Sequence, residues 1–194
     1  MAAIDQNTLL ERLRASLDLF GGYVHAVRPD QWGAPTPCAE WSVRDLVNHL
    51  TGEQLWVVPL VGEGRTIADV GDAFDGDVLG DDPAAAWDAA ARGARDAFSA
   101  PGALDRTVRL SYGPSPAVGY CSQMAADAIV HSWDLARAIG ADDRLPAELV
   151  DFAEREYAPY VADLAKSGVF GPPVEPPPGA DAQTRLLSVL GRRV

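Results

Sequence analysis

The sequence lacks a hydrophobic run long enough to cross a membrane. Its longest strongly apolar stretch covers residues 55–61, whereas a membrane-spanning helix needs roughly 20 apolar residues. The first residues, Met1 to Asp5, also lack the basic and then apolar pattern of a secretory signal peptide. We therefore expect a cytoplasmic protein without a transmembrane segment.

Positive charge is scarce as well. The 194 residues include 16 Lys and Arg against 28 Asp and Glu, which gives a formal net charge of -12, and Lys166 is the single lysine. Nucleic acids and anionic membranes attract cationic protein surfaces. We therefore expect neither a nucleic acid nor a membrane to be a partner of this protein.

Cysteine is rare, and the common catalytic motifs are missing. Cys38 and Cys121 do not form a C-x-x-C pair and are too few for a disulfide framework, so we expect both to be small buried hydrophobic residues. Cys38 precedes a predicted helix, a position where a thiol can have a lowered pKa. The sequence also lacks a glycine-rich phosphate loop and a G-x-S-x-G motif. Histidines and carboxylates are therefore the candidate functional groups.

Helical periodicity is present through most of the chain, and it predicts an all-α fold. Apolar residues recur at three- and four-residue steps, which is the period of one helix face. Ser42 and Asp45 have the spacing of a capping box, and Asp82 before Pro83 has the pattern of another helix start. Helices are predicted over residues 8–28, from 42 onward, 83–98, 120–139, 146–166 and 181–190.

Further residues mark the predicted helix boundaries. Thr8 and Glu11 form a capping-box pattern at the start of the first helix, and Pro29 ends that helix. Gly140 ends the helix that begins near Tyr120.

Two segments in the middle of the chain do not have a helical pattern. Residues 62–82 are rich in aspartate and glycine, which predicts a long acidic loop or lid. Residues 106–112 alternate apolar and polar side chains, as in a short strand or extended arm, and the breakers at 113–116 end this pattern.

A proline-rich tract near the end suggests a domain boundary. Residues 171–179 contain five prolines and are expected to form an extended connector. We therefore divide the chain into a helical bundle domain over residues 1–168 and a Pro-rich connector with a short C-terminal helix over residues 169–194.

Two of the three histidines and one aspartate have the spacing of a metal site. Asp127 and His131 are four residues apart, so a helix places them on one face with Cβ atoms about 5–6 Å apart. A carboxylate and an imidazole at that separation can share a divalent cation, about 2.0–2.2 Å from each donor atom. His49, at the edge of another apolar helix face, is the candidate third ligand. A simple hydrogen-bonded Asp–His pair is the alternative interpretation.

Other residues near these motifs have weaker signals. Glu53 follows His49 by four residues and could replace Asp127 as a ligand. Asp134 is a candidate for fixing the tautomer of an imidazole that binds the metal. Trp41 and Trp133 are expected to pack in the core or against helix ends. His25, near the end of the first helix, is expected to be exposed and without function.

Two motifs together resemble a known family. Residues 36–50 read TPCAEWSVRDLVNHL, residues 127–138 read DAIVHSWDLARA, and a Gly191-Arg192 pair follows near the end. In order and spacing they resemble the actinobacterial maleylpyruvate isomerase-like, mycothiol-dependent proteins of the DinB/YfiT superfamily. The resemblance covers most of the chain.

The resemblance implies a fold and a metal site. The fold is a DinB-like four-helix bundle of up-down-down-up order, and the metal is a divalent cation, zinc or nickel, held by three side chains at one end of the bundle. Carried over residue by residue, the ligands are His49, Asp127 and His131. The mycothiol-dependent isomerase has glutamate where this chain has Asp127, and many relatives have histidine, so the shorter aspartate is a departure.

The resemblance also implies a class of reaction. A cation at this site would bind a thiol and lower its pKa for addition or transfer, which predicts a thiol transferase or isomerase that uses mycothiol or a related thiol as cosubstrate on a small electrophile. The isomerase has a C-terminal domain larger than residues 169–194 can form. The alternative is a non-catalytic helical bundle that binds a metal or ligand, and we expect a monomer or a homodimer in either case.

Overall fold

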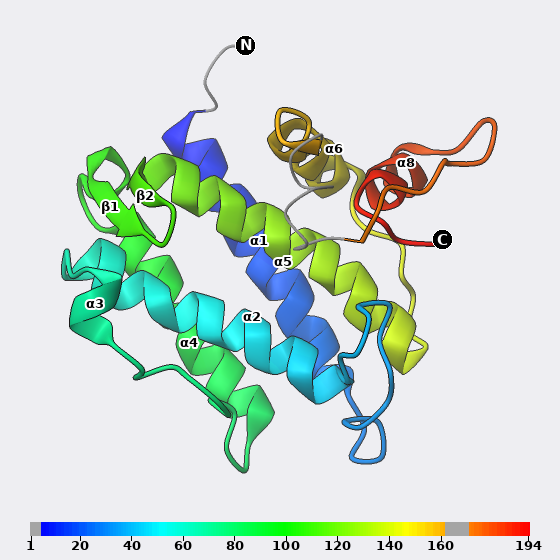
Figure 1. Ribbon diagram of the computed structural model, residues 1–194, viewed down its shortest axis with the longest axis horizontal. Coiled ribbons are helices and arrows are strands. Elements are labelled where there is room, and N and C mark those ends of the chain that lie inside the picture. The colour runs from blue at the N-terminus through cyan, green and yellow to red at the C-terminus, as the bar shows by residue number, and fades with distance from the viewer. Residues whose placement is uncertain (1–4, 162–170) are drawn as a thin grey trace.

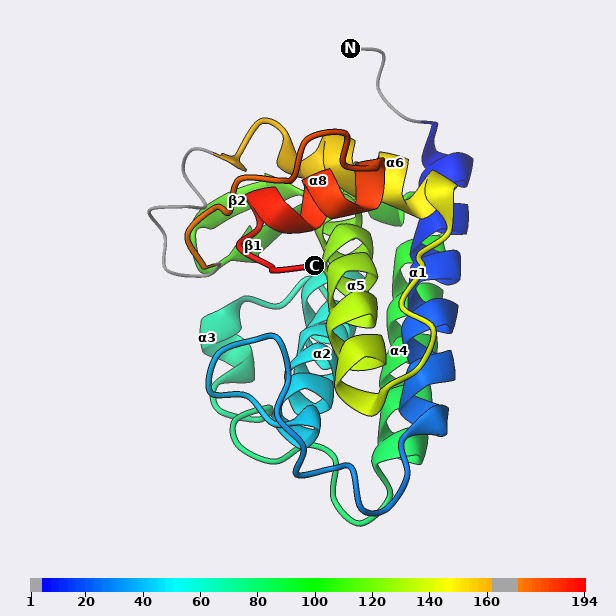
Figure 2. The same cartoon turned by 90° about the vertical axis from the view of Figure 1, so that its right-hand side faces the viewer.

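Four long helices form the body of the protein (Figure 1). The computed structural model describes residues 5–161 and 171–194. Helices α1 and α5 run in one direction, and α2 and α4 run in the opposite direction (Figure 2). The observed architecture is therefore the predicted four-helix bundle with up-down-down-up order. The bundle helices are α1 (Gln6–Ala26), α2 (Val43–Val57), α4 (Pro83–Ser99) and α5 (Ala117–Ile139).

Helix α5 lies at the centre of the protein. It contacts α1 and α2 within the bundle and α6 (Ala147–Tyr157) on its outer side. Buried residues therefore occur on all of its faces, including the polar residues His131, Ser132 and Asp134. A helix covered all round can hold a polar group only if that group finds a partner. Because α5 is covered on all sides, its buried polar residues must find hydrogen-bond or ion-pair partners within the protein.

Local signals account for most of the helix boundaries. The Ser42–Asp45 capping box is confirmed, because the Asp45 N–H donates to Ser42 Oγ at 3.2 Å and the Ser42 N–H donates to Asp45 Oδ2 at 2.9 Å. Asp82 caps α4, and Pro83 is its first residue, as predicted. Helix α5 ends at Gly140, whose φ of 70° lies in the left-handed region that glycine adopts most easily.

The first and last predicted boundaries differ from the structure. Helix α1 is capped by Asp5, which accepts a hydrogen bond from the Thr8 N–H at 3.1 Å, so the predicted Thr8–Glu11 capping box is wrong. Aspartate caps at least as well as threonine and comes first in the chain. The helix ends at Ala26, shortly before Pro29, because a proline disfavours helical backbone at the residue that precedes it. Helix α6 ends at Tyr157, and its predicted end at Lys166 lies outside the described residues.

The segments without a helical pattern have more structure than expected. Strand β1 (Thr107–Leu110) is the predicted strand, and it pairs in antiparallel fashion with β2 (Gly113–Pro116), which was predicted only as a break. Two prolines are tolerated in β2 because they occupy alternate positions, whose missing N–H groups can face away from β1. Between α2 and α4 lie a π-helical turn (Val58–Gly62) and α3 (Ile67–Val70), so the predicted acidic loop is partly helical.

The C-terminal segment returns to the bundle. Helix α8 (Ala182–Val189) begins after the cap Asp181 and packs against α6, close to the predicted range 181–190 (Figure 2). A short 3-10 helix (Ala103–Asp105) precedes β1. None of the helices that the structure describes is long and apolar enough to cross a membrane. The residues after α8 lead back toward α5, where they complete the site described below.

Ser42→Ala tests the local control of α2, the helix that carries His49. Removing the hydroxyl leaves the Asp45 N–H without its cap, so we expect the free energy of unfolding to fall by about 1 kcal/mol. Urea denaturation measures the change. Ser111→Ala, on the exposed turn between β1 and β2, is the matched control and should stay within about 0.5 kcal/mol of the parent. Equal effects of the two substitutions would contradict a capping role.

Candidate functional site

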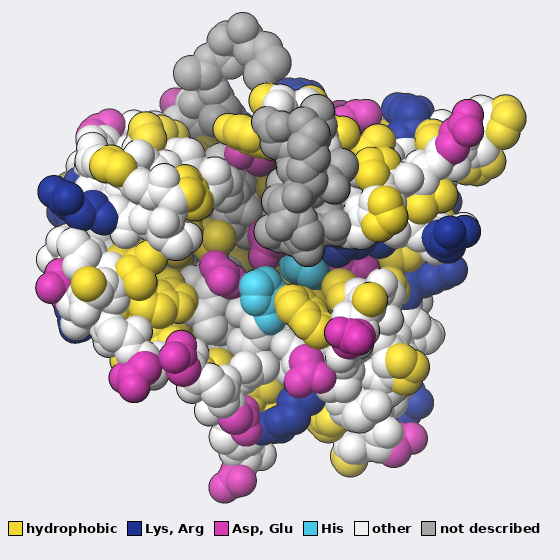
Figure 3. Space-filling view, viewed as in Figure 1, with side chains coloured by type: hydrophobic (Ala, Val, Ile, Leu, Met, Phe, Trp, Pro, Cys, Tyr) yellow, Lys and Arg dark blue, Asp and Glu magenta, His cyan; other side chains and the backbone are white. Residues whose placement is uncertain are grey.

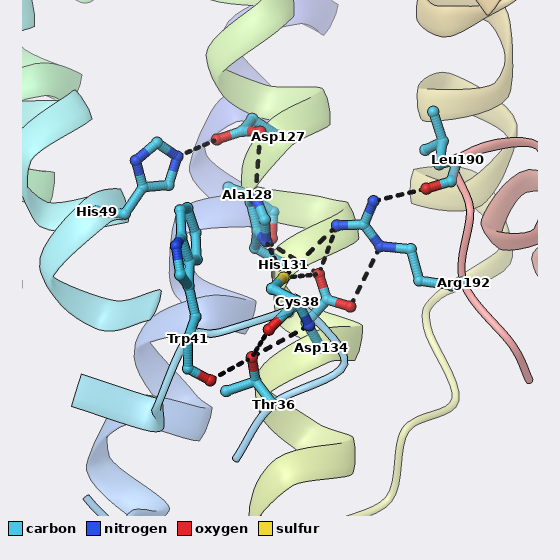
Figure 4. A network of polar contacts seen from close by, with 11 residues as sticks. Thr36, Cys38, Trp41, His49, Asp127, Ala128, His131, Asp134, Leu190 and Arg192 are labelled. Carbon is cyan, nitrogen blue, oxygen red and sulfur yellow. Dashed lines mark hydrogen bonds and ion pairs between the residues drawn. The ribbon is translucent and has the colours of Figure 1, made fainter. Parts of the chain in front are cut away.

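The structure brings together the three residues that the sequence singled out. His49 on α2 faces Asp127 and His131 on α5 (Figure 4). His49 Nε2 lies 4.0 Å from Asp127 Oδ2, and His131 Nε2 lies 3.5 Å from Asp127 Oδ1. One donor atom from each residue falls within 4.8 Å of the others. The cluster lies about midway along both helices, on the side of the bundle where α2 and α5 meet, and not at one end of the bundle as the resemblance implied.

This geometry and donor set fit a divalent cation. Tetrahedral ligands that are each about 2.0–2.2 Å from zinc lie about 3.4 Å from one another. The two observed separations, 3.5 Å and 4.0 Å, need little adjustment to reach that value. Two imidazoles and a carboxylate are also common ligands of zinc and nickel. The His49 and Asp127 side chains keep 33% and 21% of their exposure, so an ion there would be accessible from solvent.

The far side of the His131 ring is held by a buried ion pair. His131 Nδ1 lies 2.9 Å from Asp134 Oδ2, and Asp134 is fully buried. Arg192, from the segment after α8, donates to both oxygens of Asp134 from Nη2 at 2.8 Å and Nε at 3.3 Å. The guanidinium also donates from Nη1 to the Leu190 carbonyl at 2.8 Å. Because Nδ1 faces Asp134, the second nitrogen Nε2 is directed at Asp127.

The charges of the cluster are strongly coupled. Burial raises the pKa of Asp134, but hydrogen bonds and charge from His131 and Arg192 outweigh it and hold the pKa below the usual range of a carboxyl group. Burial by itself would lower the pKa of His131. The negative charges of Asp127 and Asp134 have the larger, opposite effect, so the pKa of His131 is raised. The pKa of His49 is lowered, chiefly by burial. The two imidazoles therefore differ in proton affinity, with His49 the weaker base.

Cys38 forms a second cluster on the other side of His131. Its Sγ lies 3.3 Å from Asp134 Oδ2 and 3.8 Å from His131 Nδ1. These three donors also lie within 4.8 Å of one another. A cation is disfavoured there because the Arg192 guanidinium already faces Asp134 and lies 3.8 Å from the sulfur. Within residues 5–161 and 171–194 these are the two groups that could hold an ion, and Glu53 belongs to neither.

Aromatic packing confines the site. The Trp41 ring lies 4.8 Å from the His49 ring, centroid to centroid, and 6.1 Å from the His131 ring, to which it is nearly parallel. Trp41 was expected to pack in the core or at a helix end, and it packs against both candidate ligands. Trp133 is buried, with the Arg137 guanidinium 5.4 Å from its ring. His25 is exposed, as expected, and pairs with Asp88 at 3.1 Å.

Two cavities meet at Trp41 and His49. One, of about 560 Å³, is lined by Cys38, Asp127, His131 and Arg192 among others. The other, of about 600 Å³, lies on the far side of the Trp41–His49 wall. Figure 3 shows histidine side chains at the centre of this hollowed face, with acidic side chains around them. No local sequence pattern links Cys38 or Arg192 to the helix that they contact, so their contacts with Asp134 were not predicted.

Comparison with known proteins gives consistent matches. Residues 13–136 match the family described as mycothiol maleylpyruvate isomerase N-terminal domain. Uncharacterized proteins MT0763 and Rv0738 of Mycobacterium tuberculosis are each 36% identical over 132 residues, which cover 68% of this chain and 68% of each relative.

Solved structures share the fold. The crystal structure of the mycothiol-dependent maleylpyruvate isomerase matches with a TM-score of 0.65 at 13% identity, over 85% of this chain and 73% of that one. A histidine-to-alanine mutant of the isomerase matches with a TM-score of 0.64 at 12% identity, over 81% of this chain and 70% of that one.

Arg192→Met tests the buried ion pair. The substitution removes the cation that faces Asp134 and leaves a buried carboxylate with less compensation, so we expect the protein to lose about 3 kcal/mol of unfolding free energy. Arg193→Met changes the same residue type at the next, exposed position and should cost less than about 0.5 kcal/mol. Denaturation in the presence of a chelator measures both. Similar small losses in the two variants would show that the pair contributes little.

Proposed function

We propose, on the premise that this chain belongs to the mycothiol maleylpyruvate isomerase N-terminal domain family, that it is a divalent-metal-dependent thiol transferase or isomerase. Its cosubstrate would be mycothiol or a related thiol, and its substrate a small electrophile. The observation that supports this proposal most is the convergence of His49, Asp127 and His131 where α2 meets α5.

The residues proposed to hold the ion are His49, Asp127 and His131, and the ion is zinc or nickel. Their donor set and separations suit these metals, as described above. When bound, the ion would supply a Lewis acid that lowers the pKa of a thiol. Three protein ligands would leave coordination positions open, which is the arrangement of catalytic rather than structural sites.

Surrounding residues would prepare the site for this chemistry. Asp134 and Arg192 hold the His131 ring in one orientation, so its Nε2 does not have to be reoriented before an ion binds. Trp41 covers one side of both imidazoles and excludes water from that side. The two cavities on either side of Trp41 offer separate spaces for a thiol and an electrophile.

We also propose that residues 1–168 act as the bundle domain and residues 169–194 as its appendage. Arg192 of the appendage reaches the site through its contacts with Asp134. The C-terminal segment would then contribute to function by keeping His131 in place.

Metal binding should stabilise the protein. If Zn²⁺ binds the folded protein and not the unfolded chain, Zn²⁺ at 100 times its dissociation constant stabilises the fold by about 2.7 kcal/mol. For a chain of this size, that corresponds to a rise in Tm of roughly 5–10 °C. We expect this rise in chelator-stripped protein, measured by calorimetry, and we expect His49→Ala to abolish it. His49 is only half-buried, so its removal should leave the fold intact.

His25→Ala is the matched control for that experiment. His25 is exposed and far from the cluster in sequence and contacts, so this variant should keep the full response to Zn²⁺. A full response in His49→Ala would contradict the proposed ligand set and point to adventitious binding, for instance along acidic residues 62–82.

The metal-loaded protein should also bind mycothiol more tightly than the stripped protein, by at least about tenfold, because an ionised thiol gains attraction to the cation. Isothermal titration calorimetry measures this difference. His49→Ala and His131→Ala should each remove it, and S-methylated mycothiol, which cannot ionise, should show none. Identical affinities in loaded and stripped protein would favour a non-catalytic binding protein instead.

A further inference from the structure

The cavity on the far side of Trp41 has an acidic lining. It lies against α2 and the segment between α3 and α4, and its volume is about 600 Å³. Glu40, Asp45, Glu53 and Asp75 supply four carboxylates, and no lysine or arginine is among the described residues that line it. The cavity therefore presents negative charge from several sides, directly beside the candidate metal site.

The same cavity has aromatic walls. Trp56 on α2 and Phe74 on the facing segment meet edge to face, with ring centroids 5.2 Å apart and an interplanar angle of 83°. Trp41 forms the wall that is shared with His49. Aromatic rings combined with carboxylates recognise organic cations, since a ring face attracts positive charge and binds apolar groups at the same time.

The segment that closes the cavity is fixed to α2. Asn48 Nδ2 donates to the Gly76 carbonyl at 2.8 Å, and the Val78 N–H donates to Asn48 Oδ1 at 2.8 Å. Arg44 on the same helix pairs with Asp77 at 2.7 Å. These contacts hold the segment that carries Phe74 and Asp75 against α2, so the shape of the cavity does not depend on a ligand.

The carboxylates of this cavity are not grouped closely enough for three of them to share one ion. Across the described parts of the chain, the groups of acidic, histidine and cysteine donors close enough to share one ion are the two around His131, and none consists of the cavity carboxylates. No hydrogen bond or ion pair joins Glu53 to another described residue, and burial, with the charge of Asp127, raises the pKa of Glu53 to about 7. The carboxylates are spaced for a ligand larger than a metal ion.

We propose that this cavity binds the substrate and that the substrate carries an organic cation, a protonated amine or a quaternary ammonium group. The proposal rests on the function proposed for the neighbouring metal site. A divalent ion bound through Asp127 would add one net positive charge, which the carboxylates of Glu40, Asp45 and Asp75 exceed even without Glu53. A dicarboxylate would instead be repelled by these carboxylates.

Choline and its uncharged isostere dimethylbutanol test the proposal, because they differ in charge but hardly in shape. Binding is measured by calorimetry on the full chain, both stripped and Zn²⁺-loaded. An ionic strength of about 0.15 M limits the contribution of distant surface charge. Choline should bind at least about tenfold more tightly than dimethylbutanol. Maleate, a dicarboxylate, should not bind in this cavity and should not compete with choline.

Two conservative variants locate the binding. Glu53→Gln and Asp75→Asn should each weaken choline binding by about threefold to tenfold. Glu175→Gln removes a carboxylate, as Asp75→Asn does, but at an exposed residue of the connector, and should leave choline affinity unchanged. Equal affinity for choline and dimethylbutanol, or choline affinity unaffected by both cavity variants, would overturn the proposal.

The outcome is separable from that of the proposed function. Stabilisation by Zn²⁺ and its loss in His49→Ala concern the metal site, and we expect Glu53→Gln to keep the parental response to Zn²⁺ because Glu53 is outside the ligand cluster. Selective choline binding without a Zn²⁺ response would support the cation cavity and refute the metal site. A Zn²⁺ response without selective choline binding would support the metal site and refute the cation cavity.

Discussion

The buried carboxylate of Asp134 is the constraint on which the site depends. A charge without exposure to solvent is costly unless it is paired and hydrogen-bonded, and here His131 and Arg192 provide the partners. Arg192 can do so only if the C-terminal segment folds back over α5. The same interaction therefore attaches the end of the chain to the bundle and fixes the ring that faces Asp127. Stability and the proposed function share one set of contacts.

The position of α5 explains why these contacts are strong. It is covered by α1, α2 and α6, so its polar residues lie in a region of low dielectric constant where pairing and orientation matter most. His49, on α2, is half-exposed. The candidate metal site thus has a rigid, dry side at His131 and a side open to solvent at His49. A catalytic centre needs both, since ligands must be preorganised while reactants exchange.

Trp41 separates two cavities of different chemistry. The first contains Cys38 and the Arg192–Asp134 pair, and its charges are largely balanced within the protein. The second combines carboxylates with aromatic rings and lacks a balancing cation among its described lining. Two reactants can therefore approach from different sides, and charge would decide which of them enters the acidic cavity. In this interpretation the metal site sets the chemistry and the acidic cavity selects the substrate.

The sequence by itself determined the helices and much of the candidate cluster. Capping by Ser42 and Asp82 and termination at Gly140 are local interactions, so they follow from residue type and order. The separation of Asp127 and His131 is local too, because one turn of helix fixes it. His49 was predicted as the third member from its place at the edge of an apolar helix face, and the motif resemblance implied the same three ligands. Strand β2 was missed because prolines usually break strands, and α3 was missed within a segment whose composition indicated a loop.

Only the tertiary structure decided what surrounds that cluster. Arg192 meets Asp134 across 58 positions of sequence, and Cys38 meets the same carboxylate across 96. Phe74 reaches Trp56 through a connection held by Asn48. Helical periodicity cannot predict such contacts, because it describes one helix at a time. They depend on how separate helices pack and on which partner a buried charge finds after the chain has folded.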